Sequence, residues 1–326
     1  MVKRVLLASP RGYCAGVERA VDTVEQALEL WGAPVYVRKQ IVHNAHVVRD
    51  LEERGAIFVD SEDDVPEGEV VVFSAHGVAP AVYERARERG LAAIDATCPL
   101  VTKVHSEARL YASLGYAILL IGHAGHDEVE GTLGEAPEAI VLVQSVEEAE
   151  RLELPATERL AYLTQTTLSV DETGEIITVL ERRFPHIEGP KKDDICYATS
   201  NRQWAVKALL PEVDLVLVIG SENSSNSNRL VEVAQAGGVP AYLIDDESEI
   251  REAWLEGVET VGLTSGASAP ERLVRSVCTW FRVRGVDDIR PHRSIHEDVS
   301  FKLPLLVRET PATRRTGEAS LAPTRP

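Results

Sequence analysis

One pattern recurs along most of the chain: a short apolar run, a loop of small polar residues, and a stretch with the periodicity of an amphipathic helix. Continuous apolar strands that alternate with amphipathic helices are typical of parallel sheets covered on both faces. The pattern therefore predicts an α/β fold. The clearest apolar runs are residues 5–8, 70–73, 117–121, 160–163, 215–219 and 260–263.

The loops after these runs are rich in Gly, Ser, Thr and His. In open parallel sheets, ligands bind beyond the carboxyl ends of the strands, so we expect several small sheets to face one shared cavity. The loops are SPRGYCAG (9–16), SAHGV (74–78), DATCPLV (95–101), GHAGHDEVEGT (122–132), TQTTLS (164–169), GSENSSNSN (220–228) and TSGASAP (264–270).

Charge and composition exclude some classes of function. The chain of 326 residues carries a formal net charge of -18, which argues against broad nucleic-acid binding because that needs a basic surface. No run approaches the roughly 18 apolar residues of a membrane helix, and the N-terminus becomes polar too quickly for a signal peptide. We therefore expect a cytoplasmic protein without a nucleic-acid or membrane partner, although a local anion site remains compatible with the charge.

Three of the four cysteines, Cys14, Cys98 and Cys196, lie in turns before helical stretches, where the helix dipole favours a thiolate. A reducing cytosol does not favour disulfides, and no CxxC pair is present. Three such thiolates suggest a soft metal: zinc would usually need a fourth ligand, whereas an iron–sulfur cubane held by three cysteines would keep one iron open. Coincidence is the competing interpretation. Cys278 follows a helical apolar stripe and is expected in the core.

Histidines in three of the polar loops indicate anion or proton chemistry: His43, His76 and His126, the last with His123 nearby. Glu128 follows His126 at an expected helix start, where it is either a capping acid or a general acid. The remaining histidines in polar contexts are expected at the surface. They are His105, His186, His292 and His296.

Hydroxyl and amide side chains gather where a helix is expected to begin after the strand at 215–219. There, Ser224, Ser225 and Asn226 either hold phosphate oxygens together with backbone N–H groups or simply cap the helix. Ser268 has the same placement, and Thr166 and Thr167 add two more hydroxyls. The GxGxxG and GxxxxGK[ST] motifs are absent from the sequence, so neither a standard dinucleotide site nor a P-loop is supported.

Taken in order, these motifs resemble those of the IspH/LytB family of 4-hydroxy-3-methylbut-2-enyl diphosphate reductases, over about residues 3–282. The resemblance implies three small α/β domains with parallel-rich sheets, arranged in pseudo-threefold fashion around a central iron–sulfur cluster. The implied domains are 14–96, 97–193, and 1–13 plus 194–282; a C-terminal extension, 283–326, is expected to end in disorder. The motifs that carry the resemblance are PRGYCAGV, VHN, FSAHGV, DATCPLVTKVH, IGHAGHDEVEGT, TQTTLSVD, GPKKDDICYATSNRQ, GSENSSNSNRL and TSGASAP, with no departure at a motif position.

The same resemblance implies an activity, the reductive dehydroxylation of (E)-4-hydroxy-3-methylbut-2-enyl diphosphate to isopentenyl and dimethylallyl diphosphate. This is the last step of the non-mevalonate isoprenoid pathway, with reduced ferredoxin or flavodoxin as the implied electron donor. A non-catalytic iron–sulfur redox sensor and a zinc hydrolase acting on a phosphorylated substrate remain the alternatives.

Site roles also follow from the resemblance. Cys14, Cys98 and Cys196 would hold a [4Fe-4S] cluster with one open iron. Glu128, Thr166 and His126 would serve catalysis, with Glu128 delivering protons. The substrate-binding residues would be His43, His76, His126, Thr166, Ser224, Ser225, Asn226 and Ser268.

Overall fold

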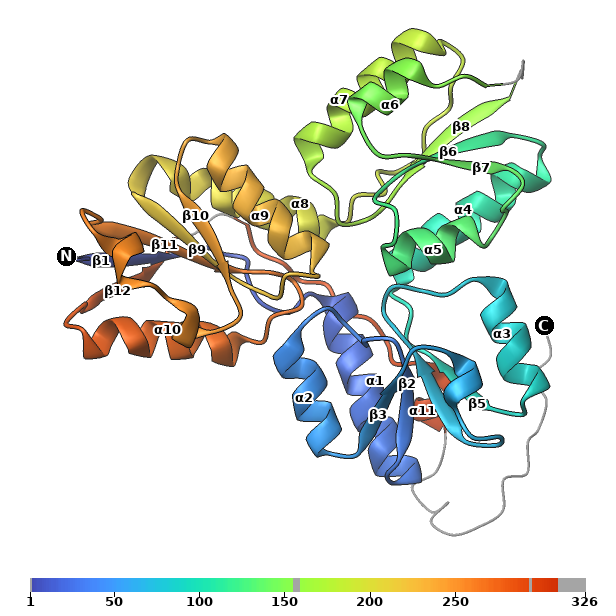
Figure 1. Cartoon of the computed structure of the whole chain (residues 1–326), viewed down its shortest axis with the longest axis horizontal. Coiled ribbons are helices and arrows are strands. Elements are labelled where there is room, and N and C mark those ends of the chain that lie inside the picture. The colour runs from blue at the N-terminus through green and yellow to red at the C-terminus, as the bar shows by residue number, and fades with distance from the viewer. Residues whose placement is uncertain (1, 155–158, 293–294, 310–326) are drawn as a thin grey trace.

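The computed structural model describes residues 2–154, 159–292 and 295–309. It contains three separate sheets in which every strand pairing is parallel, so the expected α/β fold is confirmed. The three sheets with their helices form three lobes that meet at the centre of the molecule (Figure 1). The end of the chain at 310–326, for which we expected disorder, lies outside the described residues.

The first sheet has four strands in the order β3-β2-β4-β5. In chain order these are β2 (Val35–Arg38), β3 (Ala56–Val59), β4 (Val70–Phe73) and β5 (Ala92–Asp95). The helices of this lobe are α1 (Ala15–Trp31), α2 (Ala45–Glu53) and α3 (Pro80–Glu88), with the short 3-10 turn η1 (Glu62–Asp64).

The second sheet has three strands in the order β7-β6-β8. They are β6 (Ala117–Ile121), β7 (Ile140–Val143) and β8 (Leu160–Thr164). Its helices are α4 (Pro99–Ser113), α5 (Asp127–Leu133), α6 (Val146–Arg151) and α7 (Val170–Arg183).

The third sheet combines both ends of the chain, in the order β10-β9-β11-β1-β12. Its strands are β1 (Arg4–Leu7), β9 (Leu215–Ile219), β10 (Ala241–Ile244), β11 (Thr260–Ser265) and β12 (Asp288–Pro291). Its helices are α8 (Tyr197–Leu209), α9 (Ser225–Ala236) and α10 (Glu271–Val283), with the 3-10 turns η2 (Leu210–Glu212), η3 (Glu247–Glu249) and η4 (Glu252–Leu255).

Burial on both faces explains the continuous apolar runs of the central strands. In β4, Val70 and Val72 pack into one apolar cluster, whereas Val71 and Phe73 pack into another. Successive side chains of a strand point to opposite faces, so an all-apolar strand needs helices on both sides. The same division occurs in β6 and β9, whose alternate residues also belong to two clusters each. Cys278 is buried in the larger cluster of the third sheet, as expected.

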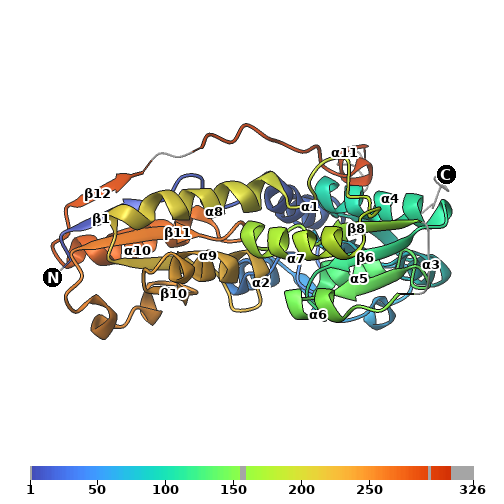
Figure 2. The same cartoon turned by 90° about the horizontal axis from the view of Figure 1, so that it is seen from above.

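The C-terminal segment joins two lobes. After β12 pairs with β1, the chain crosses from the third sheet to the first, where α11 (Leu305–Glu309) inserts Val307 into the apolar cluster beneath α1 (Figure 2). The domain limits expected from the sequence stay a prediction. Within the described ranges, no helix combines the length and the apolar character that crossing a bilayer requires.

A buried arginine fixes this crossing segment. Arg202 on α8 is fully buried, and its guanidinium donates to the carbonyls of Gly12 (2.7 Å) and Ala198 (2.9 Å). It also pairs with Glu297 of the C-terminal segment at 3.1 Å. Because Gly12 lies just before Cys14, this one side chain ties α8, the first turn of the chain and the C-terminal segment together.

One expectation about a histidine was wrong. His105 is only 5% exposed, and its Nδ1 lies 2.7 Å from the Glu135 carboxylate. Its ring packs against Gly77 of the first lobe so closely that a Cβ there would lie 3.0 Å from it. The histidine faces a neighbouring lobe rather than solvent, and helical periodicity alone does not reveal that contact.

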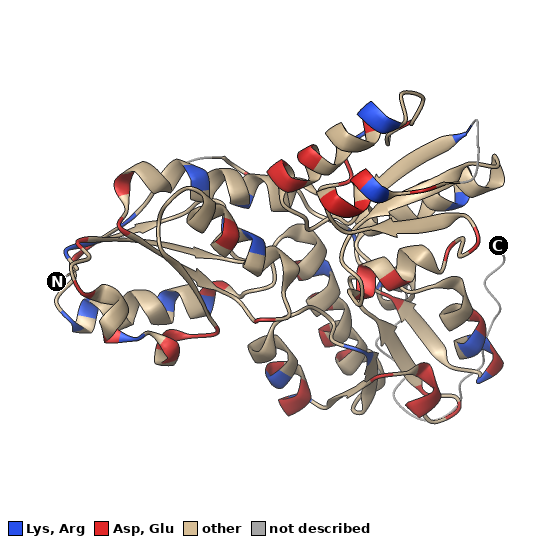
Figure 3. Ribbon diagram, turned by 45° about the horizontal axis from the view of Figure 1, so that its top comes forward, with Lys and Arg blue, Asp and Glu red and all other residues tan. Residues whose placement is uncertain are grey.

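Acidic side chains lie on helices and loops of all three lobes (Figure 3). This distribution agrees with the net charge of -18. Whether an anionic ligand can bind therefore depends on the charges and hydrogen-bond donors around its own site.

We predict that Arg202→Met lowers the free energy of unfolding by about 3 kcal/mol, because it removes the buried donor to the Gly12 carbonyl and the charge that pairs with Glu297, whose remaining donor is the neutral amide of Asn201. Urea unfolding measures the effect. Lys3→Met is the control, since Lys3 forms only an exposed pair with Glu259 and its loss should not change stability measurably. Equal midpoints for both variants would contradict the role of Arg202.

Candidate active site

A cavity with about 660 Å³ of empty space lies where the three lobes meet. The structure brings every sequence-predicted site residue to its wall, together with Thr167, whereas His123 does not line it. The predicted residues on the wall are Cys14, His43, His76, Cys98, His126, Glu128, Thr166, Cys196, Ser224, Ser225, Asn226 and Ser268.

Each of the three cavity cysteines is the residue immediately before a helix: Cys14 before α1, Cys98 before α4 and Cys196 before α8. The backbone N–H of each cysteine donates to a carbonyl in the loop after another strand, which fixes the start of the helix against that loop. The acceptors are Ala267 for Cys14 (3.2 Å), Ala75 for Cys98 (3.0 Å) and Thr166 for Cys196 (3.0 Å).

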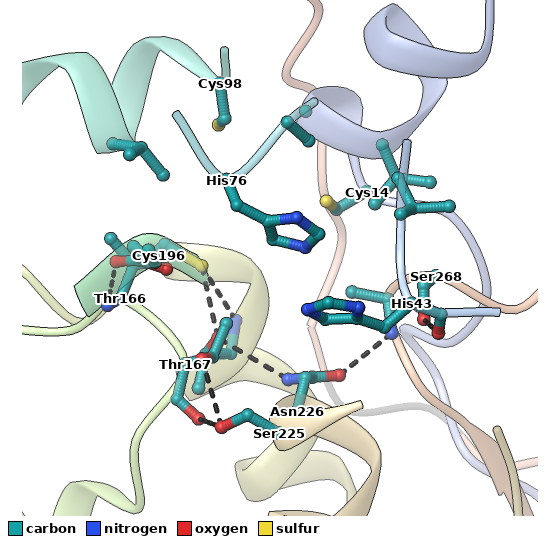
Figure 4. A pocket seen from close by; sticks show the side chains of 18 of the residues that line it. Cys14, His43, His76, Cys98, Thr166, Thr167, Cys196, Ser225, Asn226 and Ser268 are labelled. Carbon is teal, nitrogen blue, oxygen red and sulfur yellow. Dashed lines mark hydrogen bonds between the residues drawn. The ribbon is translucent and has the colours of Figure 1, made fainter. Parts of the chain in front are cut away.

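The three thiols enter the same space from three sides (Figure 4). Gly16 makes the approach of two of them possible: a Cβ at this position would lie 2.6 Å from Cys98 Sγ and 3.8 Å from Cys14 Sγ. Burial raises the pKa of Cys98 to about 12 and that of Cys196 to about 11, and the neighbouring Cys14 adds to both shifts. Thiolates in this cavity therefore require a compensating cation, as a bound metal provides.

Glu128 is a buried acid whose oxygens both accept hydrogen bonds from Thr166. The Thr166 N–H donates to Oε1 (2.6 Å) and its hydroxyl donates to Oε2 (3.0 Å). Burial nevertheless dominates and raises the pKa of Glu128 to about 7. The carboxyl group can therefore hold and release a proton near neutral pH.

His126 precedes α5 and accepts a hydrogen bond at Nδ1 from the Glu128 N–H (3.1 Å). Burial lowers the pKa of His126 to about 4, so its ring is neutral at pH 7. In a neutral imidazole whose Nδ1 accepts, Nε2 carries the proton. His126 is thereby held in the tautomer that presents an N–H donor.

His43 and His76 stack on each other with ring centroids 4.0 Å apart, and the ring of His126 meets both edge-on. Burial lowers the pKa of His43 and His76 as well. Hence the cavity contains three closely grouped imidazoles that are neutral without a ligand and can gain protons when an anion binds beside them.

Hydroxyls and an amide from the third lobe complete the wall. Ser224 is the N-cap of α9, Ser225 begins that helix with its hydroxyl 3.1 Å from that of Thr167, and Asn226 accepts from the Ala267 N–H (2.9 Å). Ser268 donates to the His43 carbonyl (2.9 Å), which joins the first and third lobes. A helix N-terminus lined with hydroxyls suits phosphate oxygens.

Three polar residues at or beside the site escaped the sequence analysis. Thr199 lies 3.2 Å from Cys196 Sγ through its hydroxyl. Lys39 and Asp127 form an ion pair beside His43 and His76. Asp127 stands between His126 and Glu128 in a motif already recognised, so that motif could have drawn attention to it, whereas Lys39 follows the unremarkable strand β2.

Sequence comparison gives close relatives. A model of the LytB protein family matches residues 5–282. A protein from Acidothermus cellulolyticus named 4-hydroxy-3-methylbut-2-enyl diphosphate reductase is 62% identical over 96% of this chain and 94% of that protein. One of the same name from Nocardia farcinica is 60% identical over 96% of this chain and 93% of its own length.

Structural comparison agrees. The solved structure of the E-1-hydroxy-2-methyl-but-2-enyl-4-diphosphate reductase from Plasmodium falciparum is similar with a TM-score of 0.90 and 40% identity, over 94% of this chain and 98% of that chain. A second structure, of an (E)-4-hydroxy-3-methyl-but-2-enyl diphosphate reductase, gives a TM-score of 0.62 and 33% identity over 87% of this chain and all of that chain. With the family match extending across all three sheets, this chain belongs to the LytB protein family.

Proposed function

We propose that this protein catalyses the reductive dehydroxylation of (E)-4-hydroxy-3-methylbut-2-enyl diphosphate to isopentenyl diphosphate and dimethylallyl diphosphate. One observation carries the proposal: three thiols, a buried protonatable carboxyl group and a set of phosphate-type donors line one cavity. The names of the relatives support it. The net reaction consumes two electrons and two protons and releases water, so the site must both transfer electrons and donate protons.

The residues present fit an iron–sulfur cluster held by Cys14, Cys98 and Cys196. The thiols share one cavity, Gly16 leaves room beside two of them, and burial disfavours the thiolates of Cys98 and Cys196 unless a cation is bound. The proposed group is a [4Fe-4S] cluster with three cysteine ligands. When bound, it would supply electrons and, at the one iron without a cysteine ligand, a Lewis-acidic site for the substrate hydroxyl.

The protein's own side chains bind and orient the substrate. The N–H of His126 and the hydroxyl groups at the N-terminus of α9 would donate to the diphosphate oxygens, in a wall that contains no lysine or arginine among the described residues. The full diphosphate set we propose is His43, His76, His126, Ser224, Ser225, Asn226 and Ser268. Such neutral donors can hold an anion because burial strengthens each hydrogen bond.

Protons would come from Glu128. Its carboxyl group contacts the Thr166 hydroxyl directly, and Thr166 lines the cavity, so the proton would pass through that hydroxyl to the leaving oxygen of the substrate. His126 would stabilise the start of α5, because its Nδ1 accepts from the Glu128 N–H.

We further propose reduced ferredoxin or flavodoxin as the electron donor, a cytoplasmic location, and domains at 14–96, 97–193, and 1–13 plus 194–282. A non-catalytic iron–sulfur sensor would need the same thiols but not the buried pair of Glu128 and Thr166. The presence of that pair therefore favours the proposed enzyme over the non-catalytic sensor.

The direct test is anaerobic turnover of the hydroxylated C5 diphosphate with a chemical reductant. We expect both isomeric diphosphate products, identified by mass spectrometry or NMR after removal of phosphate. The same protein without reductant is the control. Unchanged substrate with a fully loaded, reduced protein would contradict the proposed function.

We predict that Cys98→Ser abolishes the visible absorption of the anaerobically purified protein and its turnover, because a hydroxyl is a poor ligand for iron. Cys278→Ser is the matched control, since Cys278 is buried in the apolar cluster of the third sheet. It should keep both properties even if it lowers stability. Full iron and sulfide content in Cys98→Ser would exclude Cys98 as a ligand.

Glu128→Gln should lower the turnover rate by about 10²-fold while substrate still binds, because only the proton donor is lost. The wild-type rate should fall as pH rises through about 7, since a carboxyl group with this raised pKa loses its proton there. The variant should lack this limb of the pH profile. Glu181→Gln, on the exposed face of α7, serves as the control. Normal turnover in Glu128→Gln would favour the sensor.

A further inference from the structure

Lys39 occupies an unusual backbone position at the end of β2. Its φ is +54°, and it is the one residue other than glycine with positive φ in the described ranges. This left-handed conformation is unfavourable for a residue with a side chain. It directs the ammonium group across the boundary between lobes to α5, where Nζ lies 2.5 Å from Asp127 Oδ1 and 2.8 Å from Glu130 Oε2.

Asp127 brings a negative charge close to the imidazoles proposed to bind the diphosphate. Its second oxygen, Oδ2, lies 4.0 Å from His43 Nε2 and 3.9 Å from His76 Nδ1. The Asp127 side chain is only 15% exposed, so solvent screens it weakly. Left alone, this carboxylate would repel a diphosphate bound by the same imidazoles.

Lys39 is the cation that pairs with Asp127 beside the three imidazoles. The cavity wall itself contains no lysine or arginine among the described residues. Burial is the main cause that lowers the pKa of the three imidazoles, and the positive charge of Lys39 adds to the lowering at each of them. Arg38 lines a neighbouring cavity with Lys39 and Asp127, but it is paired with Glu62 at 2.8 Å. The other charged groups nearby are acidic: Glu130 pairs with Lys39, and Asp60 and Asp64 line a second neighbouring cavity.

We propose that Lys39 determines the affinity of the site for its diphosphate by neutralising Asp127 beside His43 and His76. This proposal rests on the proposed function, because that function places the diphosphate at the imidazoles. It assigns Lys39 a role in binding through charge, without a direct part in the chemical step. The ligand class is a small organic diphosphate, and inorganic diphosphate is its simplest probe.

The same geometry suits a purely mechanical role, in which Lys39 only latches the first lobe to α5. The two roles differ in the effect of removing Asp127. A latch that is lost with Lys39 is not restored by also removing Asp127, because the ion pair of Lys39 with Glu130 is lost as well. A neutralising charge, in contrast, is needed only while the carboxylate is present.

The experiment measures binding of inorganic diphosphate to the anaerobic, cluster-loaded protein by calorimetry at low salt, together with KM and kcat for the hydroxylated C5 diphosphate. Lys39→Met should weaken binding about tenfold and raise KM with little change in kcat, the size expected for one partly screened charge. Asp127→Asn should bind at least as tightly as wild type. The double variant should return to within about twofold of wild type, since the single effects are then not additive. Lys39→Arg keeps the charge and should resemble wild type.

Lys207→Met is the matched control. Lys207 on α8 pairs with Asp171 on α7 at 2.6 Å, so it also bridges two lobes, but neither residue lines the cavity or the neighbouring cavities that contain Lys39. Its loss should leave diphosphate binding unchanged.

Three results would overturn the inference. Wild-type affinity in Lys39→Met would show that the charge is irrelevant. A double variant that binds as weakly as Lys39→Met would show a latch, because the ion pairs to α5 are lost with Lys39 whether or not Asp127 is present. A wild-type protein that neither binds diphosphate nor turns over substrate would remove the proposed function and the inference with it, whereas normal turnover with unaffected variants would remove the inference alone.

Discussion

Parallel strands place all their carboxyl ends at one edge of a sheet, and this constraint creates the site. Each sheet contributes loops at that edge, and each loop leads into a helix whose first N–H groups are unpaired within the helix. Cys14 and Cys98 stand at such starts, and Cys196 stands at the start of α8, which follows helix α7; three helices therefore direct their N-termini toward one cavity. A metal centre and an anion can then be held at the meeting point of the lobes by residues that are far apart in the sequence.

Burial then determines the chemistry of the individual groups. It raises the pKa of Glu128 to about 7 and lowers that of His126 to about 4, so the acid keeps a proton and the base does not. It also disfavours free thiolates at Cys98 and Cys196. A protein with a net charge of -18 can therefore present a cavity of neutral donors, in which a single outlying ion pair has a large influence.

The sequence predicted the fold class because the central strands are apolar on both faces, as in β4, β6 and β9. It did not predict six other strands. Three of them, β2, β5 and β12, mix apolar with polar or small residues. The other three, β3, β7 and β10, are apolar runs of only four residues that were not recognised as strands. The residues of the cavity wall could be named because their motifs follow strand ends. The burial of His105 and the position of Lys39 depend on contacts between lobes, which local periodicity does not encode.

The place of β1 in the third sheet has a consequence for biosynthesis. Both of its neighbours, β11 and β12, are translated after the first and second sheets, so β1 has no partner while those two sheets emerge from the ribosome. The turn with Cys14 follows that strand directly and is anchored to the carbonyl of Ala267. Its thiol is therefore held at the cavity only after residue 267 has been translated, later than the whole of the first and second sheets.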